Sequence, residues 1–245
     1  MVFNRSLNFL CFNSNFKTKS ADIFSLGCVY YFVLTWGKHP FGLPLRRNAN
    51  ILVSKGKFDE LEKEHEGFSW LLSSMTSKTI DKRPPASEIL QHHIFWTKEK
   101  SLNFLVNISN RTKTPSVRLD NCITSLEARI KLFHDKSDTW LPSLCPVLRN
   151  HLTVKFGKKQ KASTVMDLIR LIRNMHNHIS EEVVPSELKK AMGVSSSDFF
   201  DYWITRFPYI VAVTWIAFRP LKKQQDYGLV DYYSEFNFEF GTFKK

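Results

Sequence analysis

The sequence predicts a mainly α-helical protein, and three stretches carry that prediction. Residues 163–179 place apolar side chains at the three-to-four-residue spacing of one helix face. Residues 20–36 form a strongly apolar run with Ser20 as a candidate N-cap and Gly37 just past its end, which are start and stop signals of a helix. The apolar run at 209–218 is far shorter than the roughly 18 residues of a membrane span, and it is typical of a buried helix.

The composition describes a globular chain with an excess of positive charge. Its 245 residues are 43% hydrophobic and carry 35 Lys and Arg against 23 Asp and Glu, a formal net charge of +12. This length allows one large or two modest domains. The charge favours polyanionic partners such as nucleic acid or phosphoinositides. The alternative is a protein that is merely basic.

Cysteine spacing and the amino terminus bear on the compartment. Cys11, Cys28, Cys122 and Cys145 are scattered without CxxC spacing. Neither a zinc site nor a disulfide framework is therefore expected, and reduced thiols in the cytoplasm fit best. Residues 1–16 are punctuated by Asn and make a poor signal peptide.

The first half of the chain continues with short helices. Residues 1–19 show no periodicity and stay unassigned, and a Pro/Gly loop follows the apolar helix. A short helix is predicted at 45–54, and a further helix within 58–76 has FSWLLSSM as its buried part. Pro84–Pro85 stops one element, and residues 86–92 begin the next helix with proline in its first turn.

The helix predicted at 163–179 has two distinct faces. An arc of roughly 120° holds its apolar stripe, made of Val165, Leu168, Ile169, Ile172, Met175, His176 and Ile179. The other side, within roughly 140°, gathers Arg170, Arg173, Asn174, Asn177 and His178. Ser163 or Thr164 can cap the start, where Asp167 suits the helix dipole. Guanidinium, amide and imidazole groups together suit a phosphate ligand. An ordinary basic helix face is the alternative.

Several motifs in a fixed order resemble a known family. DIFSLGCVYYFVL with GKHPFG, followed by DKRPPASEILQHHIFW, resembles the second half of a protein-kinase C-lobe. KHPFGLPLRRNANIL is similar to the Ire-type sensors of the unfolded-protein response, which, like RNase L, carry a kinase-extension nuclease (KEN) domain after the kinase lobe. FWTKEKSLNFLVNISNR resembles the junction, DLIRLIRNMHNH the nuclease helix, and SSSDFFDYWITRFPYIVAVTW the closing helices.

This resemblance implies a domain organisation and a fold class. A partial protein-kinase C-lobe is expected at 20–100 and an all-helical KEN ribonuclease domain at 101–220. An unassigned segment at 1–19 precedes them, and a tail at 221–245 follows. The resemblance covers residues 20–218, which is most of the chain.

Kinase activity is not expected from this chain. The sequence has no Gly-rich phosphate loop, no Val-Ala-Ile-Lys strand, no His-Arg-Asp loop and no Asp-Phe-Gly, so nothing holds Mg²⁺ or positions ATP. No cofactor is therefore expected here, although the resemblance implies that full-length members bind ATP or ADP with Mg²⁺ in their kinase domain.

Two charged residues match positions whose partners in a complete kinase lobe are missing from this sequence. They are Asp22 and Arg83. Because an unpaired buried charge costs several kcal/mol, they predict a truncated chain whose first residues replace true kinase sequence. The alternative is a minimal protein in which Asp22 serves as the first-turn carboxylate of its helix.

The resemblance implies a metal-independent endoribonuclease, in which the 2′-hydroxyl attacks the adjacent phosphate and leaves 2′,3′-cyclic phosphate and 5′-hydroxyl ends. The catalytic residues carry over by motif onto His178, Arg173 and Asn174. An imidazolium can protonate the leaving 5′-oxygen, a role worth about 10²–10⁴-fold, while a guanidinium and an amide neutralise charge on the phosphate. The lack of clustered Asp, Glu and Cys argues separately against a metal nuclease.

The main departure from the family lies in the basic loop at 155–161. The family places a Tyr about a dozen residues before the Arg, whereas this chain has Lys159, Gln160 or Lys161 there. A lysine is a poor default base for the 2′-hydroxyl. RNA contacts are predicted for Arg170, Asn177, Lys158, Lys159 and Lys161. A solvated loop is the alternative for the lysines.

The resemblance also implies partners and a location. RNA is the expected substrate, a homodimer the expected assembly, and the cytoplasm the expected location, or for an Ire-type protein the cytosolic face of the endoplasmic reticulum membrane. The role would lie in the unfolded-protein response or RNA-decay signalling. The alternative is a catalytically impaired module that dimerises with a full-length paralogue or binds RNA without cutting it. The missing Tyr favours this alternative, and the retained Arg173, Asn174 and His178 favour the enzyme.

Aromatic and imidazole side chains elsewhere are expected to be structural. His92 and His93, beside Trp96, should pack against the last C-lobe helix, and a metal role is not favoured for them. Trp140, Trp203 and Trp215 stand in apolar context and are expected in the core rather than as platforms for stacking bases.

Overall fold

Helices make up the regular structure of the part of the chain that the structure describes. The computed structural model describes residues 19–58, 61, 66–111, 116–130, 139–156, 163–179, 181, 184–193, 195–223 and 229–233, and within these ranges it contains no β-strand. The mainly α-helical prediction is therefore confirmed. The chain forms two compact units, the second of which begins at Trp96. The limits predicted for the kinase-like and nuclease domains stay predictions, because compactness alone does not identify a domain.

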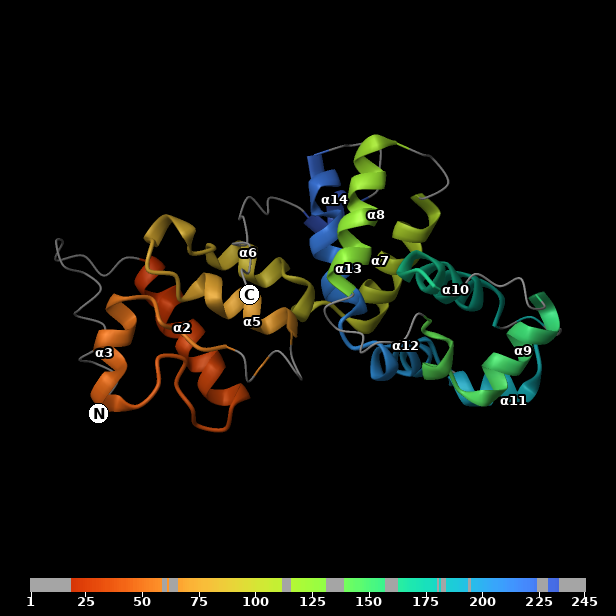
Figure 1. Ribbon diagram of the computed structural model, residues 1–245, viewed down its shortest axis with the longest axis horizontal. Helices are drawn as coiled ribbons and strands as arrows, with labels where there is room; N and C mark the ends of the chain where they lie inside the picture. Colours follow the sequence, from red (N-terminus) through yellow and green to blue (C-terminus); the bar gives the residue numbers. More distant parts are fainter. Residues whose placement is uncertain are drawn as a thin grey trace. The chain divides into compact units, whose positions relative to one another are not determined.

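The first unit is organised around two helices that pack side by side, α2 and α5 (Figure 1). Its elements are α2 (Lys19–Leu34), α3 (Pro44–Leu52), α5 (Glu66–Met75), η1 (Ile80–Lys82), α6 (Ala86–Gln91) and η2 (His93–Phe95). Its core gathers Ile23 and Tyr31 of α2 with Leu71, Leu72 and Met75 of α5, all buried. The helices predicted at 20–36, 45–54 and 86–92, and within 58–76, are confirmed to within a few residues.

The two ends of α2 differ from each other in how well the sequence predicts them. Because Lys19 is already helical, Ser20 lies inside α2 and is not its N-cap, as the sequence had suggested. At the other end, Gly37 takes a φ of +106°, a conformation that favours glycine. Its N–H donates to the carbonyl of Phe32 at 2.8 Å, which closes the helix at the predicted place.

The prediction of unpaired buried charges at Asp22 and Arg83 is wrong. Asp22 is exposed in the first turn of α2, where a carboxylate is favourable. Arg83 is buried, but its Nε donates to the carbonyl of Ser77 and its Nη1 to that of Ser20, each at 2.8 Å. Its guanidinium also lies 5.0 Å from the ring centre of Phe24. Two backbone carbonyls and an aromatic face are therefore among the groups that stabilise this buried charge.

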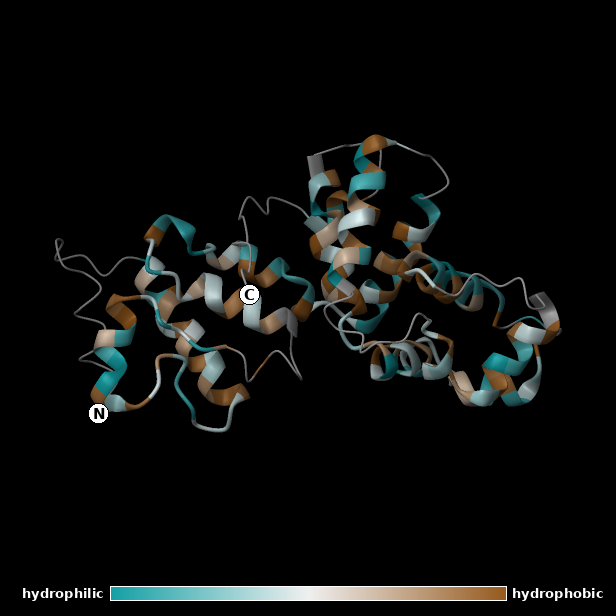
Figure 2. Ribbon diagram, in the orientation of Figure 1, coloured by the Kyte–Doolittle hydropathy of each residue, from teal (hydrophilic) through white to brown (hydrophobic). Residues whose placement is uncertain are grey.

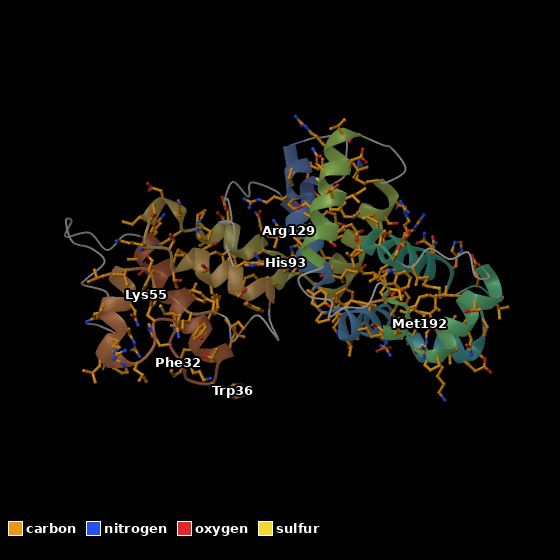
Figure 3. The ribbon with its side chains drawn as sticks, in the orientation of Figure 1. Phe32, Trp36, Lys55, His93, Arg129 and Met192 are labelled. Carbon is orange, nitrogen blue, oxygen red and sulfur yellow. The ribbon has the colours of Figure 1, made fainter. Side chains whose placement is uncertain are left out.

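The adjacent histidines after α6 are part of the interior. His92 and His93 are both buried, with ring centres 4.3 Å apart. Burial lowers the pKa of His93, labelled in Figure 3, to about 3. A side chain that stays neutral in the interior fits the predicted packing role.

The second unit is a bundle in which α7 contacts α10, α12 and α13, while α8 packs against α13. Its elements are α7 (Lys98–Arg111), α8 (Val117–Ile130), η3 (Leu141–Ser143), α9 (Pro146–Phe156), α10 (Val165–His178), α11 (Ser186–Met192), α12 (Ser196–Arg206), α13 (Ile210–Phe218), η5 (Arg219–Lys223) and α14 (Val230–Tyr233).

Buried aromatic and apolar side chains hold this bundle together. Every residue of α13 except Ile216 is buried, which confirms the buried helix predicted at 209–218. Trp140, Trp203 and Trp215 are at most 4% exposed and are core residues, as predicted. No helix in the described ranges has both the length and the apolar character to cross a bilayer.

The three cysteines that the structure describes carry free thiols. Cys28 and Cys122 are buried, and burial raises their thiol pKa values to about 12 and about 11. Cys145 is half-buried. Cys11 lies outside the described residues.

Candidate active site on helix α10

Helix α10 begins at a capped and anchored turn. The side-chain hydroxyl of Thr164 accepts a hydrogen bond from the backbone N–H of Asp167 at 3.1 Å, so Thr164 rather than Ser163 is the N-cap. The carboxylate of Glu127, on α8, accepts from the N–H groups of Val165 at 3.1 Å and Met166 at 3.2 Å. Three N–H groups of the first turn are therefore satisfied, and the helix is fixed to its neighbour.

The buried face of α10 is wider than the sequence predicted. It consists of Val165, Met166, Leu168, Ile169, Leu171, Ile172 and Met175. Met166 and Leu171 join the predicted stripe because α10 packs against both α7 and α8. His176 and Ile179, which were predicted to belong to the stripe, are only half-buried. The His176 ring lies 5.8 Å from that of Phe199, centre to centre.

The exposed polar face holds the described residues that the sequence predicted for the site, except Arg173, which lies where this face meets the buried one. Arg170, Asn174, Asn177 and His178 are exposed, whereas Arg173 is half-buried. The Nη1 of Arg170 lies 3.3 Å from Oδ1 of Asp167, one turn earlier. Asn177 has its Oδ1 3.4 Å from Nδ1 of His176. Figure 2 shows α10 with both hydrophilic and hydrophobic residues, in teal and brown.

Arg173 lies at the edge of the buried face. By helical rotation it falls between Ile169 and Met166, both buried, so its stem packs against apolar surface. Its Nε is buried and has no hydrogen-bond partner within the part of the chain that the structure describes. Leaving a buried donor unpaired costs about 1–3 kcal/mol. A guanidinium can bind an anionic ligand through its two terminal nitrogens.

His178 is the last residue of α10 and stands at the opposite edge of the polar face. Its side chain is 53% exposed, and its Nδ1 lies 2.5 Å from Oε1 of Glu181. Asn174 is one turn before His178, at a rotation between His178 and Arg173. By rotation these three residues span about 140° of the helix, and the surface patch that they define runs from the imidazole across the exposed amide to the guanidinium. Such a patch can bind a phosphate and deliver a proton to one of its oxygens.

Two glutamates of this site were missed by reasoning from the sequence. Glu181 stands three residues after His178, a spacing that brings side chains together around a helix end and could have served as a signal. Glu127 had no such signal, because it comes from α8, far away in the sequence.

Some predicted features lie outside the described residues. Lys158, Lys159, Gln160 and Lys161 are among them, so their place in a basic loop and the position of the family tyrosine stay predictions; Lys155 and Phe156, predicted to begin that loop, belong to α9 instead. Within the described ranges, no group of three or more His, Cys, Asp or Glu side chains could hold a metal ion.

The chain is similar to a defined family and to a set of longer proteins. Residues 101–233 match the family described as Ribonuclease 2-5A, and this range contains α10, Glu127 and Glu181. The chain is 34% identical to the probable serine/threonine-protein kinase ireA of Dictyostelium discoideum, in an alignment that covers 90% of the chain.

Two further relatives carry both activities in their names. The chain is 35% identical over 82% of its length to the serine/threonine-protein kinase/endoribonuclease IRE2 of Homo sapiens. It is 33% identical over 80% of its length to the serine/threonine-protein kinase/endoribonuclease IRE1a of Arabidopsis thaliana. The chain spans only 21% to 22% of the length of these three proteins. The similarities confirm the resemblance predicted from the motifs.

Proposed function

Because the chain belongs to the ribonuclease 2-5A family, we propose that its second unit is an endoribonuclease domain that cleaves RNA with Arg173, Asn174 and His178. The observation that carries this proposal is the patch on α10. There a half-buried guanidinium whose Nε has no partner among the described residues, an exposed amide and an exposed imidazole lie within about 140° of rotation on a helix that is anchored at its start.

The proposed reaction is an intramolecular transesterification. The 2′-oxygen forms a bond to the adjacent phosphorus while the bond from phosphorus to the 5′-oxygen breaks, which gives a 2′,3′-cyclic phosphate and a 5′-hydroxyl. Nε2 of His178 gives its proton to the leaving 5′-oxygen. Arg173 and Asn174 stabilise the charge that develops on the phosphate oxygens. A base must take the proton of the 2′-hydroxyl, and Lys159 or Lys161 stands near the family position for it. No step of this scheme requires a metal ion.

Binding and assembly complete the proposal. Arg170, Asn177 and the lysines at 158, 159 and 161 would hold the RNA backbone, in keeping with the net charge of +12. The active form would be a homodimer, or a dimer with a full-length paralogue. It would work in the cytoplasm or at the cytosolic face of the endoplasmic reticulum membrane.

The test is cleavage of a labelled stem-loop RNA in EDTA, over protein concentrations that span dimerisation, with analysis of the product ends. Cyclic-phosphate ends and a steep concentration dependence would support a dimeric, metal-independent nuclease. If folded protein binds the RNA but cuts none at any concentration, the chain is the regulatory module that the missing tyrosine favours.

Two histidines on α10 offer a matched pair of variants. His178→Ala should abolish cleavage while the circular dichroism spectrum and RNA binding persist. His176→Gln should still cleave, because that ring points to the other side of the helix and packs near Phe199. Unchanged cleavage by His178→Ala would overturn the proposed mechanism.

A further inference from the structure

Backbone hydrogen bonds link Ile179 and Glu181 to residues of α10. The N–H of Ile179 donates to the carbonyl of Met175 at 2.8 Å, and the N–H of Glu181 donates to the carbonyl of His178 at 3.0 Å. The Glu181 side chain reaches the imidazole of His178, where Oε1 lies 2.5 Å from Nδ1. Backbone and side chain of Glu181 thus both contact the same residue.

The chemistry of the two groups fixes where the proton of this contact lies. An ionised carboxylate can only accept a hydrogen bond, so Nδ1 of His178 must carry the hydrogen and donate it to Glu181. A neutral imidazole has one N–H, and its lone pair is then on Nε2. When the ring takes up a second proton, that proton sits on Nε2, the nitrogen on the far side of the ring from Glu181.

We propose that Glu181 is a positioning residue for His178, which holds the Nδ1–H tautomer and presents Nε2 to the RNA as the proton donor. The inference rests on the proposed function for the identity of the reaction, but the tautomer can be tested without any RNA. A carboxylate that fixes the tautomer and orientation of a catalytic imidazole through its other nitrogen is a recurrent arrangement in enzymes.

A purely stabilising role for the contact between His178 and Glu181 predicts different results from a positioning role. The two side chains are 53% and 50% exposed, and exposed ion pairs contribute little to protein stability. Loss of Glu181 should therefore leave the unfolding midpoint nearly unchanged. Removal of a carboxylate beside an RNA site should also strengthen RNA binding, because it removes repulsion of the phosphates. Loss of surface charge alone would strengthen RNA binding, and it gives no reason for kcat to fall. A lower kcat without weaker RNA binding would therefore indicate a positioning role.

The first measurement is the tautomer of His178 in the full chain, from the ¹⁵N shifts of its ring nitrogens at a pH where the ring is neutral. Wild type should show the Nδ1–H form. Glu181→Ala should revert to mainly Nε2–H, whereas Glu181→Gln should keep Nδ1–H because its amide oxygen still accepts. The control is Glu187→Ala, an exposed glutamate of α11, which should leave the spectrum unchanged. A wild-type spectrum dominated by Nε2–H would overturn the proposal.

The second measurement is the cleavage rate of the stem-loop RNA in EDTA. Glu181→Ala should lower kcat about tenfold with KM unchanged or lower, and Glu181→Gln should retain most of the rate. Wild-type kcat in Glu181→Ala would overturn the inference and leave the nuclease assignment intact. If wild type itself cuts no RNA, the proposed function fails, and the tautomer spectra alone decide whether Glu181 positions His178.

Discussion

Glu127 of α8 accepts a hydrogen bond from the backbone N–H of Val165, the first residue of α10, at 3.1 Å. The N–H groups at a helix start have no partner within the helix, and the helix dipole favours a negative charge there. The Glu127 carboxylate, which belongs to a different helix, accepts hydrogen bonds from two of these N–H groups and places a negative charge at the start of α10. The register of α10, and with it the position of Arg173, Asn174 and His178, therefore depends on α8.

Loss of this contact should destabilise the second unit. Glu127→Ala leaves the N–H groups of Val165 and Met166 without their acceptor and is expected to cost about 1–3 kcal/mol. Glu127→Gln should cost less, because its oxygen can still accept from one of them. Urea unfolding followed by circular dichroism measures both. Arg118→Ala, an exposed change on the same helix, is the control. Equal midpoints for Glu127→Ala and this control would contradict the prediction.

A second prediction concerns Arg83 in the first unit. Arg83→Lys keeps the charge but cannot reach the carbonyls of Ser20 and Ser77 together, since those bonds use two nitrogens of a planar fork. One carbonyl should lose its donor at a cost of about 1–2 kcal/mol. Faster amide hydrogen exchange in α2 would report the loss. Lys82→Arg, at the neighbouring exposed position, should leave exchange as it is, and identical exchange in both variants would refute the idea.

His93 should make the protein less stable in acid. Burial lowers the pKa of His93 from 6.5 to about 3. Below pH 6.5 the unfolded chain therefore binds a proton at His93 that the native state does not bind. Stability is therefore lost as the pH falls from 6.5 towards 3, by about 2 kcal/mol between pH 7 and pH 5. His39, whose pKa is lowered to about 4 by burial and by Arg47, acts in the same direction.

The variant His93→Gln isolates this effect, because it removes one titrating group and leaves His39 in place. Its unfolding free energy in urea should fall less between pH 7 and pH 5 than that of wild type. The same fall in both proteins would show that His93 is not the group responsible.

Periodicity was enough to predict the helix α10 and the side on which its polar residues lie. It could not predict that Arg173 would be half-buried, because the width of the buried face depends on contacts with both α7 and α8. Met166 and Leu171 are buried for the same reason. A hydrophobic pattern gives the direction of a core and says little about how far the core extends around a helix.

Hydrogen bonds between distant residues were the part that sequence reasoning could not supply. Arg83 was expected to lack a partner, but backbone carbonyls accept two of its hydrogen bonds, and carbonyls are present at every residue. Glu127 caps a helix that begins far along the chain. Such partners are fixed by tertiary packing, whereas Thr164 and Gly37 act within a few residues and could be anticipated.

The last prediction tests whether Arg173 acts through its fork or only through its charge. Arg173→Lys retains a cation on α10, so RNA binding should persist, but it loses the planar guanidinium whose terminal nitrogens we propose to stabilise the developing charge on the phosphate. We expect kcat to fall about a hundredfold while KM changes little. Arg149→Lys, at an exposed position of α9 in the same unit, is the matched control and should cleave normally. A higher KM with unchanged kcat in Arg173→Lys would mean that Arg173 only attracts RNA. The stabilisation of the phosphate would then be assigned to Asn174.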